Sequence, residues 1–163
     1  MLPLFLGMQR LMCDLSAFRY IYWSEYGHIE AAEMDGENRR TVADLTYWAG
    51  SYDARGLALD VKTNRIYFVS YYLESLLYID LDSAGHYQVS LLLYDYYLFW
   101  SPRGVALDDQ FVYWNEYFTE NVYRINKTAF DGRLDVVASG FYSPRGMAIK
   151  QGNPTQDCEF IYF

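Results

Sequence analysis

Ala54-Arg55-Gly56-Leu57-Ala58-Leu59-Asp60 is the first of three copies of one short motif in this chain. The other two copies are Pro102-Arg103-Gly104-Val105-Ala106-Leu107-Asp108 and Pro144-Arg145-Gly146-Met147-Ala148-Ile149-Lys150. An aromatic segment follows each copy and a fourth lies upstream, so that the series is Ile21-Tyr22-Trp23-Ser24, Ile66-Tyr67-Phe68-Val69, Val112-Tyr113-Trp114-Asn115 and Ile161-Tyr162-Phe163. Their tyrosines stand 45, 46 and 49 residues apart. A period of this length is typical of a propeller blade or a solenoid unit.

Short apolar and aromatic segments, separated by turn residues, fill each repeat. The expected strands are 19–24, 29–34, 40–45, 56–60, 65–71, 75–82, 88–94, 104–108, 111–116, 121–126 and 134–138. Asp35-Gly36 and Asp131-Gly132 predict tight hairpins, because both residues of an Asp-Gly pair tolerate positive φ. Four short strands per repeat predict an all-β propeller of four-stranded antiparallel blades.

The repeat divides the chain into units at about 19–45, 56–94, 104–139 and 146–163, which we group as one domain, 19–163. Residues 1–18 match the repeat poorly. Within them, Leu11-Met12-Cys13-Asp14 takes the place of Leu57-Ala58-Leu59-Asp60 but lacks the Arg-Gly pair, as a degenerate first strand would. This apolar start has no basic segment and no small-residue cleavage site, so we do not interpret it as a signal peptide.

Composition narrows the class of partner. The chain has 163 residues, a formal net charge of −8 and an aromatic content of 20%, which favours half-buried strands. A strongly acidic chain is a poor partner for nucleic acid, because binding to phosphates needs a basic face. The same charge favours a ligand that exposes Lys or Arg. Cys13 and Cys158 are not spaced as metal ligands and are interpreted as two free thiols, with a bridge between them, or from Cys158 to a partner outside this chain, as the alternatives.

No catalytic motif is present. The chain has no His-Glu-x-x-His, no Gly-x-Ser-x-Gly and no phosphate-binding Gly-x-x-x-x-Gly-Lys. Asp80 and Asp82 point the same way on an expected strand and would be able to share a cation, although a solvated strand end is the simpler interpretation. We therefore expect no enzyme activity, no cofactor and no metal, and keep a hydrolase on a propeller scaffold only as a third hypothesis.

Four segments resemble the class B (YWTD) repeats of the low-density lipoprotein receptor family. They are Tyr20 to Gly27, Met34 to Val42, Arg55 to Phe68 and Pro102 to Trp114. The resemblance covers the chain from about residue 19. It implies an incomplete six-bladed propeller, here three to four blades, from an extracellular protein. It also implies a protein-binding module of a cell-surface receptor, endocytic or signalling, in a family that includes receptors serving Wnt signals.

A matrix propeller of the nidogen type, which binds another matrix protein, is the alternative that the resemblance leaves open. In either case the expected partner is a secreted protein with a basic patch. For a receptor, the parent protein would be anchored by a single membrane span that this chain lacks. A partial propeller would leave two open blade edges, so we expect the chain alone to be less stable than a closed ring.

The sequence departs from the family pattern after each Tyr-Trp pair. The family has Thr-Asp there, whereas this chain has Ser24-Glu25, Val69-Ser70 and Asn115-Glu116. The resemblance gives the Asp a role in fixing neighbouring backbone by hydrogen bonds. We expect Glu to reach differently and Val69-Ser70 to be unable to replace it.

Candidate ligand contacts cluster at the ends of strands that reach the top face of such a propeller. Arg55, Arg103 and Arg145 occur once per unit and are read either as ties between blades or as a ring of charge for a ligand. The other candidates follow the aromatic strands or lie in the connectors, and they are Glu25, Tyr26, Tyr71, Tyr72, Glu116, Tyr117, Trp48, Trp100 and Tyr142. Exposed aromatic and Arg side chains are the residues that dominate protein interfaces.

A further set is expected to be structural. The core between blades is predicted to hold Tyr22, Trp23, Tyr67, Tyr113 and Trp114, and the motif glycines are Gly56, Gly104 and Gly146. Asn126-Lys127-Thr128 is an N-glycosylation sequon just after an expected strand.

Overall fold

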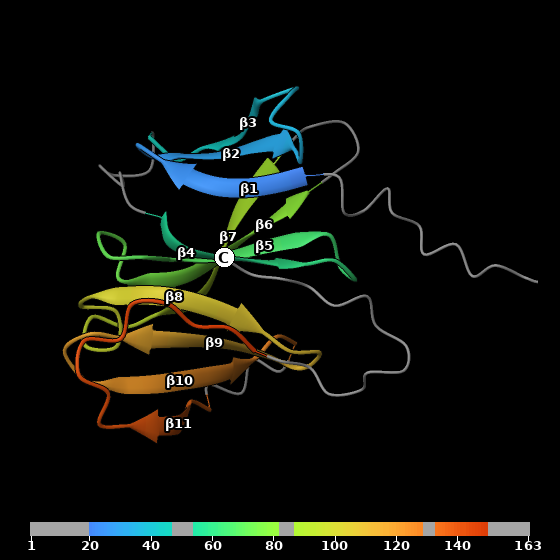
Figure 1. Cartoon of the computed structure of the whole chain (residues 1–163). Coiled ribbons are helices and arrows are strands. Elements are labelled where there is room, and N and C mark those ends of the chain that lie inside the picture. Colours follow the sequence, from blue (N-terminus) through green and yellow to red (C-terminus); the bar gives the residue numbers. More distant parts are fainter. Residues whose placement is uncertain (1–19, 47–53, 82–86, 129–132, 150–163) are drawn as a thin grey trace, which may run out of the picture.

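Three antiparallel sheets lie side by side in the computed structural model, as successive blades of a propeller (Figure 1). The structure describes residues 20–46, 54–81, 87–128 and 133–149. Every regular element in these residues is a strand, which confirms the all-β prediction. Among them there is no helix with the length and hydropathy that a membrane span requires. The predictions for residues 1–18, for the Asp131-Gly132 hairpin and for the strand at 161–163 lie outside the described residues.

The strands follow the sequence order within each sheet. The first sheet has the described strands β1 (Tyr20–Glu25), β2 (His28–Glu33) and β3 (Arg40–Asp44). The second has β4 (Ala54–Asp60), β5 (Arg65–Ser70), β6 (Ser75–Leu81) and β7 (Tyr87–Tyr94). The third has β8 (Pro102–Leu107), β9 (Phe111–Glu116), β10 (Asn121–Asn126) and β11 (Asp135–Ser139). Residues 146–149, the described start of the fourth expected unit, form no strand.

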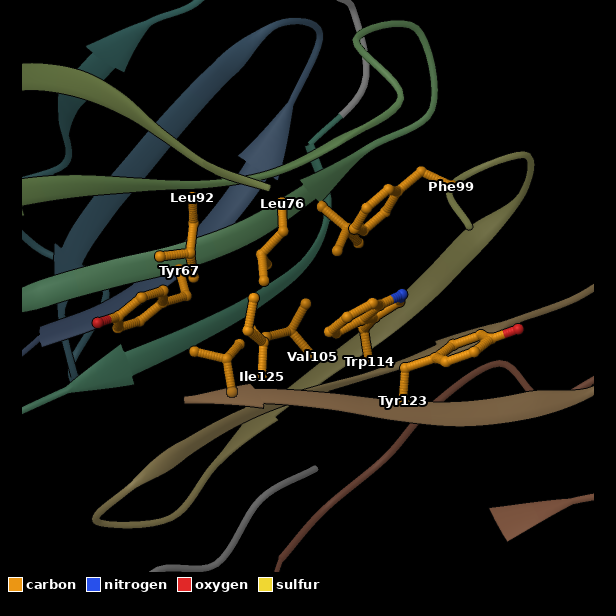
Figure 2. Packing of buried hydrophobic residues seen from close by; sticks show 10 residues of the cluster. Tyr67, Leu76, Leu92, Phe99, Val105, Trp114, Tyr123 and Ile125 are labelled. Atoms are coloured by element: carbon orange, nitrogen blue, oxygen red, sulfur yellow. The ribbon is translucent and has the colours of Figure 1, made fainter. Parts of the chain in front are cut away.

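Alternation of side chains along each strand builds one core on either side of the middle sheet. In β5, Tyr67 and Val69 belong to the cluster shared with the third sheet, whereas Ile66 and Phe68 belong to the cluster shared with the first. Successive residues of a strand point to opposite faces, so one strand serves both cores. Figure 2 shows the cluster between the second and third sheets, where Trp114 packs beside Phe99, Tyr123 and Val105.

The same alternation places the aromatic pair of each repeat on opposite faces. Tyr67 and Trp114 are almost fully buried, and Tyr22 packs at the edge of the core between the first and second sheets. Trp23 and Tyr113, also expected in the core, are only half-buried. Their rings point to the outer faces of the first and third sheets, where the described residues supply no further sheet.

The Arg-Gly pair lies inside the first strand of its sheet, in a β-bulge. Ala54 pairs with Ser70 and Leu57 with Phe68, so that Arg55 and Gly56 together stand opposite Val69. The next sheet repeats this, with Pro102 paired to Glu116 and Val105 to Trp114. The expected strands began at the glycines. The structure extends both strands to the residue before Arg, because the bulge lets ladder pairing resume on its far side.

The glycine of each pair permits close contact between neighbouring copies of the motif. A Cβ placed on Gly56 would lie 2.7 Å from both the Arg103 carbonyl oxygen and the Val105 nitrogen. A Cβ on Gly104 would lie 3.1 Å from the Met147 nitrogen. Distances below 3.0 Å to backbone atoms force the backbone to move, so β4 and β8 can lie side by side only with glycine at position 56.

A buried ion pair joins the second and third sheets at the opposite end of β4. The Lys127 ammonium donates to the Asp60 carboxylate at 2.6 Å, and the two side chains are 9% and 7% exposed. Burial by itself would raise the pKa of the Asp60 carboxyl, but the Lys127 ammonium and the Thr63 backbone N–H outweigh it and hold that pKa below its usual value. Lys62 and Asp109 form a second ion pair between the same sheets. Its nitrogen–oxygen distance is also 2.6 Å, but both side chains are exposed.

Gly56→Ala should lower the free energy of unfolding by about 1–3 kcal/mol, the usual cost of overpacking. Urea denaturation followed by far-UV circular dichroism measures this. Gly146→Ala is the matched control, because a Cβ there meets no atom of the described residues within 4 Å. It should change stability by less than about 0.5 kcal/mol. Equal effects of the two substitutions would contradict the close contact.

Asp60→Asn should destabilise the fold by about 3–5 kcal/mol at pH 7, because it removes the carboxylate that pairs directly with the buried Lys127 ammonium. Asp109→Asn, which breaks the exposed pair, should cost about 0–1 kcal/mol. Asp60 has a lowered pKa in the folded state, so its contribution is complete above the ordinary carboxyl pKa of about 3.9. It is lost as the pH falls through the lowered value. The wild-type advantage over Asp60→Asn should therefore shrink on acidification, as urea titrations at several pH values would show.

Candidate ligand-binding pocket

The three copies of the Arg-Gly motif converge on one open pocket. It has a volume of about 580 Å³ and is lined by Ser24, Glu25, Tyr26, Gly27, Ala54, Arg55, Arg103 and Arg145. The first four residues come from the end of β1 and the turn after it. The others come from the starts of β4 and β8 and from the third motif copy. For Arg55 and Arg103 the bulges contribute to the convergence, because a bulge re-aims the side chain that it carries.

The pocket carries excess positive charge although the whole chain is acidic. Among the described residues that line it, three are arginines and one, Glu25, carries a carboxylate. Glu25 is already paired, since it accepts hydrogen bonds from the Trp23 indole at 3.2 Å and from the Arg39 guanidinium at 2.6 Å. These two contacts lower the pKa of Glu25, which keeps it ionised and engaged outside the pocket.

The three arginines are held differently. The Arg55 guanidinium donates to the Ser101 hydroxyl at 3.3 Å and lies over the Tyr71 ring at 4.9 Å. Arg103 makes the equivalent contact in the next sheet, over Tyr117 at 5.7 Å. Arg145 is exposed. The contacts of Arg55 and Arg103 with aromatic rings fix the direction of the two guanidinium groups.

Arg103 contains a polar atom that the described structure does not satisfy. Its Nε is buried and has no hydrogen-bond partner among the described residues. A buried unpaired donor costs about 1–3 kcal/mol, and such groups are rare in native folds. The Nε itself is closed to solvent, so an acceptor that enters from outside would meet the part of Arg103 that lines the pocket. A carboxylate fits best, because it accepts two parallel hydrogen bonds from one guanidinium.

Glu116 does not reach this surface. Its side chain is fully buried, and the carboxylate accepts hydrogen bonds from the backbone N–H groups of Ser101 and, at 2.7 Å, Thr119. Glu therefore performs the backbone-fixing role that the family pattern gives to Asp. Ser70, at the same position in β5, accepts the local Leu73 N–H at 3.2 Å. We leave Glu116 out of the proposed ligand surface.

The other residues that the sequence suggested as ligand contacts lie in different parts of the structure. Tyr26 is 81% exposed at the turn that borders the pocket and has φ of 47°. Trp100, Tyr72 and Tyr142 are also exposed, and Trp100 lies in the connector before β8. Trp48 falls outside the described residues. Asp80 is paired with Arg65 at 2.7 Å, and the described residues contain no group of acidic, His or Cys side chains arranged to hold a metal.

Two site residues escaped the sequence reasoning. The Asn115 amide oxygen accepts the Gly104 N–H at 2.7 Å, and its NH2 group donates to the Gly146 carbonyl at 3.4 Å, so Asn115 ties two motif copies together. Ser101 positions Arg55. A signal for Ser101 was available, because Ser-Pro-Arg-Gly occurs at both 101–104 and 143–146. No repeated sequence signal marked Asn115, because the equivalent residue of β5 is Val69.

Comparison with known proteins supports the resemblance. No model of a known family matches the chain. Over 149 residues it is 28% identical to the vitellogenin receptor Yl of Drosophila melanogaster, a match that covers 85% of this chain and 7% of the receptor's length. Its fold is similar to a chain in the crystal structure of a nidogen/laminin complex, with a TM-score of 0.66 and 24% identity, over 82% of this chain and 49% of that one. The chain thus spans a small part of the receptor and about half of the solved chain.

Proposed function

Since this chain is a region of class B (YWTD) repeats of the low-density lipoprotein receptor type, we propose that it is an extracellular module that binds a secreted protein ligand. The observation that carries the proposal is the pocket at which Arg55, Arg103 and Arg145 meet. The ligand inserts an acidic side chain there, and its carboxylate pairs with the part of the Arg103 guanidinium that lines the pocket. Tyr26, Tyr71 and Tyr117 contact the ligand around the rim.

Charge elsewhere on the chain suits a ligand that is basic outside this contact. The net charge of −8 attracts exposed Lys and Arg over distances of about a Debye length. The cationic pocket then selects the orientation in which the ligand's acidic side chain faces it. The long-range attraction and the pairing at the pocket both weaken as the salt concentration rises.

A cell-surface receptor, endocytic or signalling, is our first choice for the parent protein, because the sequence match is to a receptor. Wnt signals are one class of ligand for such a receptor. The fold match to the nidogen/laminin complex favours a second candidate, a matrix propeller that binds another matrix protein. The full-length transcript separates them, because a single membrane span with cysteine-rich ligand-binding repeats marks a receptor. A secreted product without a span would exclude our first choice.

Arg103→Met should weaken binding of secreted proteins about tenfold or more while leaving the thermal midpoint unchanged. It removes the guanidinium, the charged hydrogen-bond donor that lies over Tyr117, and keeps an unbranched side chain in its place. The measurement is capture from conditioned medium by the immobilised full chain, with quantitative mass spectrometry of the bound proteins. Lys62→Met is the control, because it removes an exposed charge at the other end of β4. Capture that survives Arg103→Met would exclude the pocket, and a fall in thermal midpoint would show that Arg103 is a structural tie.

Asn126 is proposed to carry an N-linked glycan. It ends β10, and its side-chain oxygen accepts hydrogen bonds from the Thr128 backbone N–H at 2.9 Å and from the Thr128 hydroxyl at 3.1 Å. The pocket borders the opposite end of the sheet, at the start of β8, so a glycan leaves it accessible. Protein secreted from eukaryotic cells should lose one glycan mass on glycosidase treatment, and Asn126→Gln should abolish that shift. Thr128→Ser, which keeps the sequon, should preserve it, and an unmodified wild-type chain would refute the assignment.

A further inference from the structure

Four exposed aromatic rings form a continuous surface beside the pocket, which we call the aromatic platform. They belong to Tyr96, Tyr97, Trp100 and Phe118, and between 48% and 73% of each residue is exposed. Trp100 stacks on Tyr96 with ring centroids 6.0 Å apart and lies 5.4 Å from Phe118. Tyr97 meets Tyr96 edge-on at 5.3 Å. Exposed apolar surface gathered in this way marks an interaction site.

The fold holds the platform rigidly. Phe99, between two of its connector residues, is fully buried and stacks on Trp114 at 5.1 Å. The Trp114 indole donates to the Leu98 carbonyl at 3.5 Å, and the Tyr117 N–H donates to the Ser101 carbonyl at 3.1 Å. The connector from 95 to 101 and the turn after β9 are thus fixed to each other. A surface that is ordered before binding costs less entropy when a ligand docks on it.

The platform is continuous with the pocket. Phe118 meets Tyr117 edge-on at 5.1 Å, and Tyr117 lies beneath the Arg103 guanidinium. A path of touching side chains therefore leads from Arg103 through Tyr117 and Phe118 to Trp100. A ligand segment whose carboxylate pairs with Arg103 passes over the platform if its chain runs in this direction.

The chemistry of the platform favours prolyl and aliphatic groups over sugar hydroxyls. The Asp95 carboxylate, which lies beside it in sequence, is engaged by the N–H groups of Tyr97 at 2.8 Å and Leu98 at 3.2 Å. The Ser101 hydroxyl is engaged by Arg55. What the platform presents is ring faces, with the phenol hydroxyls of Tyr96 and Tyr97 as donors for peptide carbonyls. Aromatic surfaces of this kind bind polyproline II segments, whose backbone carbonyls are unpaired and whose conformation is already ordered.

We propose that the aromatic platform binds a proline-rich, extended segment of the protein ligand, next to the acidic side chain that enters the pocket. This rests on the proposed function and specifies the ligand for the same site. Each step along the path from Arg103 to Trp100 is between 5.1 and 5.7 Å. A polyproline II segment rises about 3.1 Å per residue, so at most about five residues extend from the pocket to Trp100.

The test uses a synthetic probe, a fluorescein-labelled peptide of sequence Asp-Pro-Pro-Pro-Pro-Pro, titrated with the purified full chain and followed by fluorescence anisotropy. Two further peptides separate the contributions: one replaces Asp by Asn, and the other replaces the prolines by alternating Gly and Ser. We expect either change to weaken binding about tenfold. Trp100→Ala and Phe118→Ala should weaken binding of the proline peptide by a similar factor, because truncation of an interface aromatic residue commonly costs that much or more.

Leu91→Ala is the matched control, because Leu91 is 55% exposed on β7 and lies outside the platform. It should leave binding unchanged, and thermal midpoints should agree among all variants. Equal binding of the proline and Gly-Ser peptides, no effect of Trp100→Ala, or no binding of any peptide would overturn the platform. If binding depends on Asp and Arg103 but not on proline and Trp100, the proposed function stands without the platform. If it depends on proline and Trp100 but not on Arg103, the pocket fails and the platform stands.

Discussion

The close contact between backbones at the Arg-Gly copies is the constraint on which the rest of the structure depends. Gly56 lets the strand that carries it lie against the Arg103–Val105 backbone, and Gly104 does the same toward the third copy. This contact fixes the spacing of the inner strands β4 and β8. With that spacing set, the faces of neighbouring sheets are near enough for Tyr67, Trp114 and their neighbours to share one core.

The same local feature links stability to binding. The bulges that bring Gly56 and Gly104 to their neighbours also carry Arg55 and Arg103, which line the pocket. Selection for a compact centre and selection for a cationic site therefore act on adjacent residues. Asn115 reinforces this, because it holds the Gly104 N–H and reaches the Gly146 carbonyl while leaving the Arg103 guanidinium unpaired at Nε. The site is built on rigid strands rather than on loops, as precise recognition requires.

Sequence reasoning predicted the strands and the repeat because period-2 patterning and turn residues are local signals. It also identified the three arginines that meet in the pocket. It missed the bulges, since these depend on how β4 and β8 pair with partners later in the chain. The burial of Glu116 and the ordering of Trp100 beside Phe118 also depend on contacts between segments about 15 to 18 residues apart. Charge summed over the whole chain concealed a cationic pocket, because net charge carries no information about position.

The alternation of β5 between two cores has a consequence for cooperativity. Each sheet is stabilised chiefly by the faces that it shares with its neighbours, so the chain behaves as a one-dimensional array with nearest-neighbour coupling. The middle sheet has two such couplings among the described residues, whereas the outer two have one each. Local opening should therefore begin in the outer sheets and reach the middle sheet last, so amide protons of β5 and β6 should exchange most slowly. Arg55, on the middle sheet, would keep its place through fluctuations that displace Arg145.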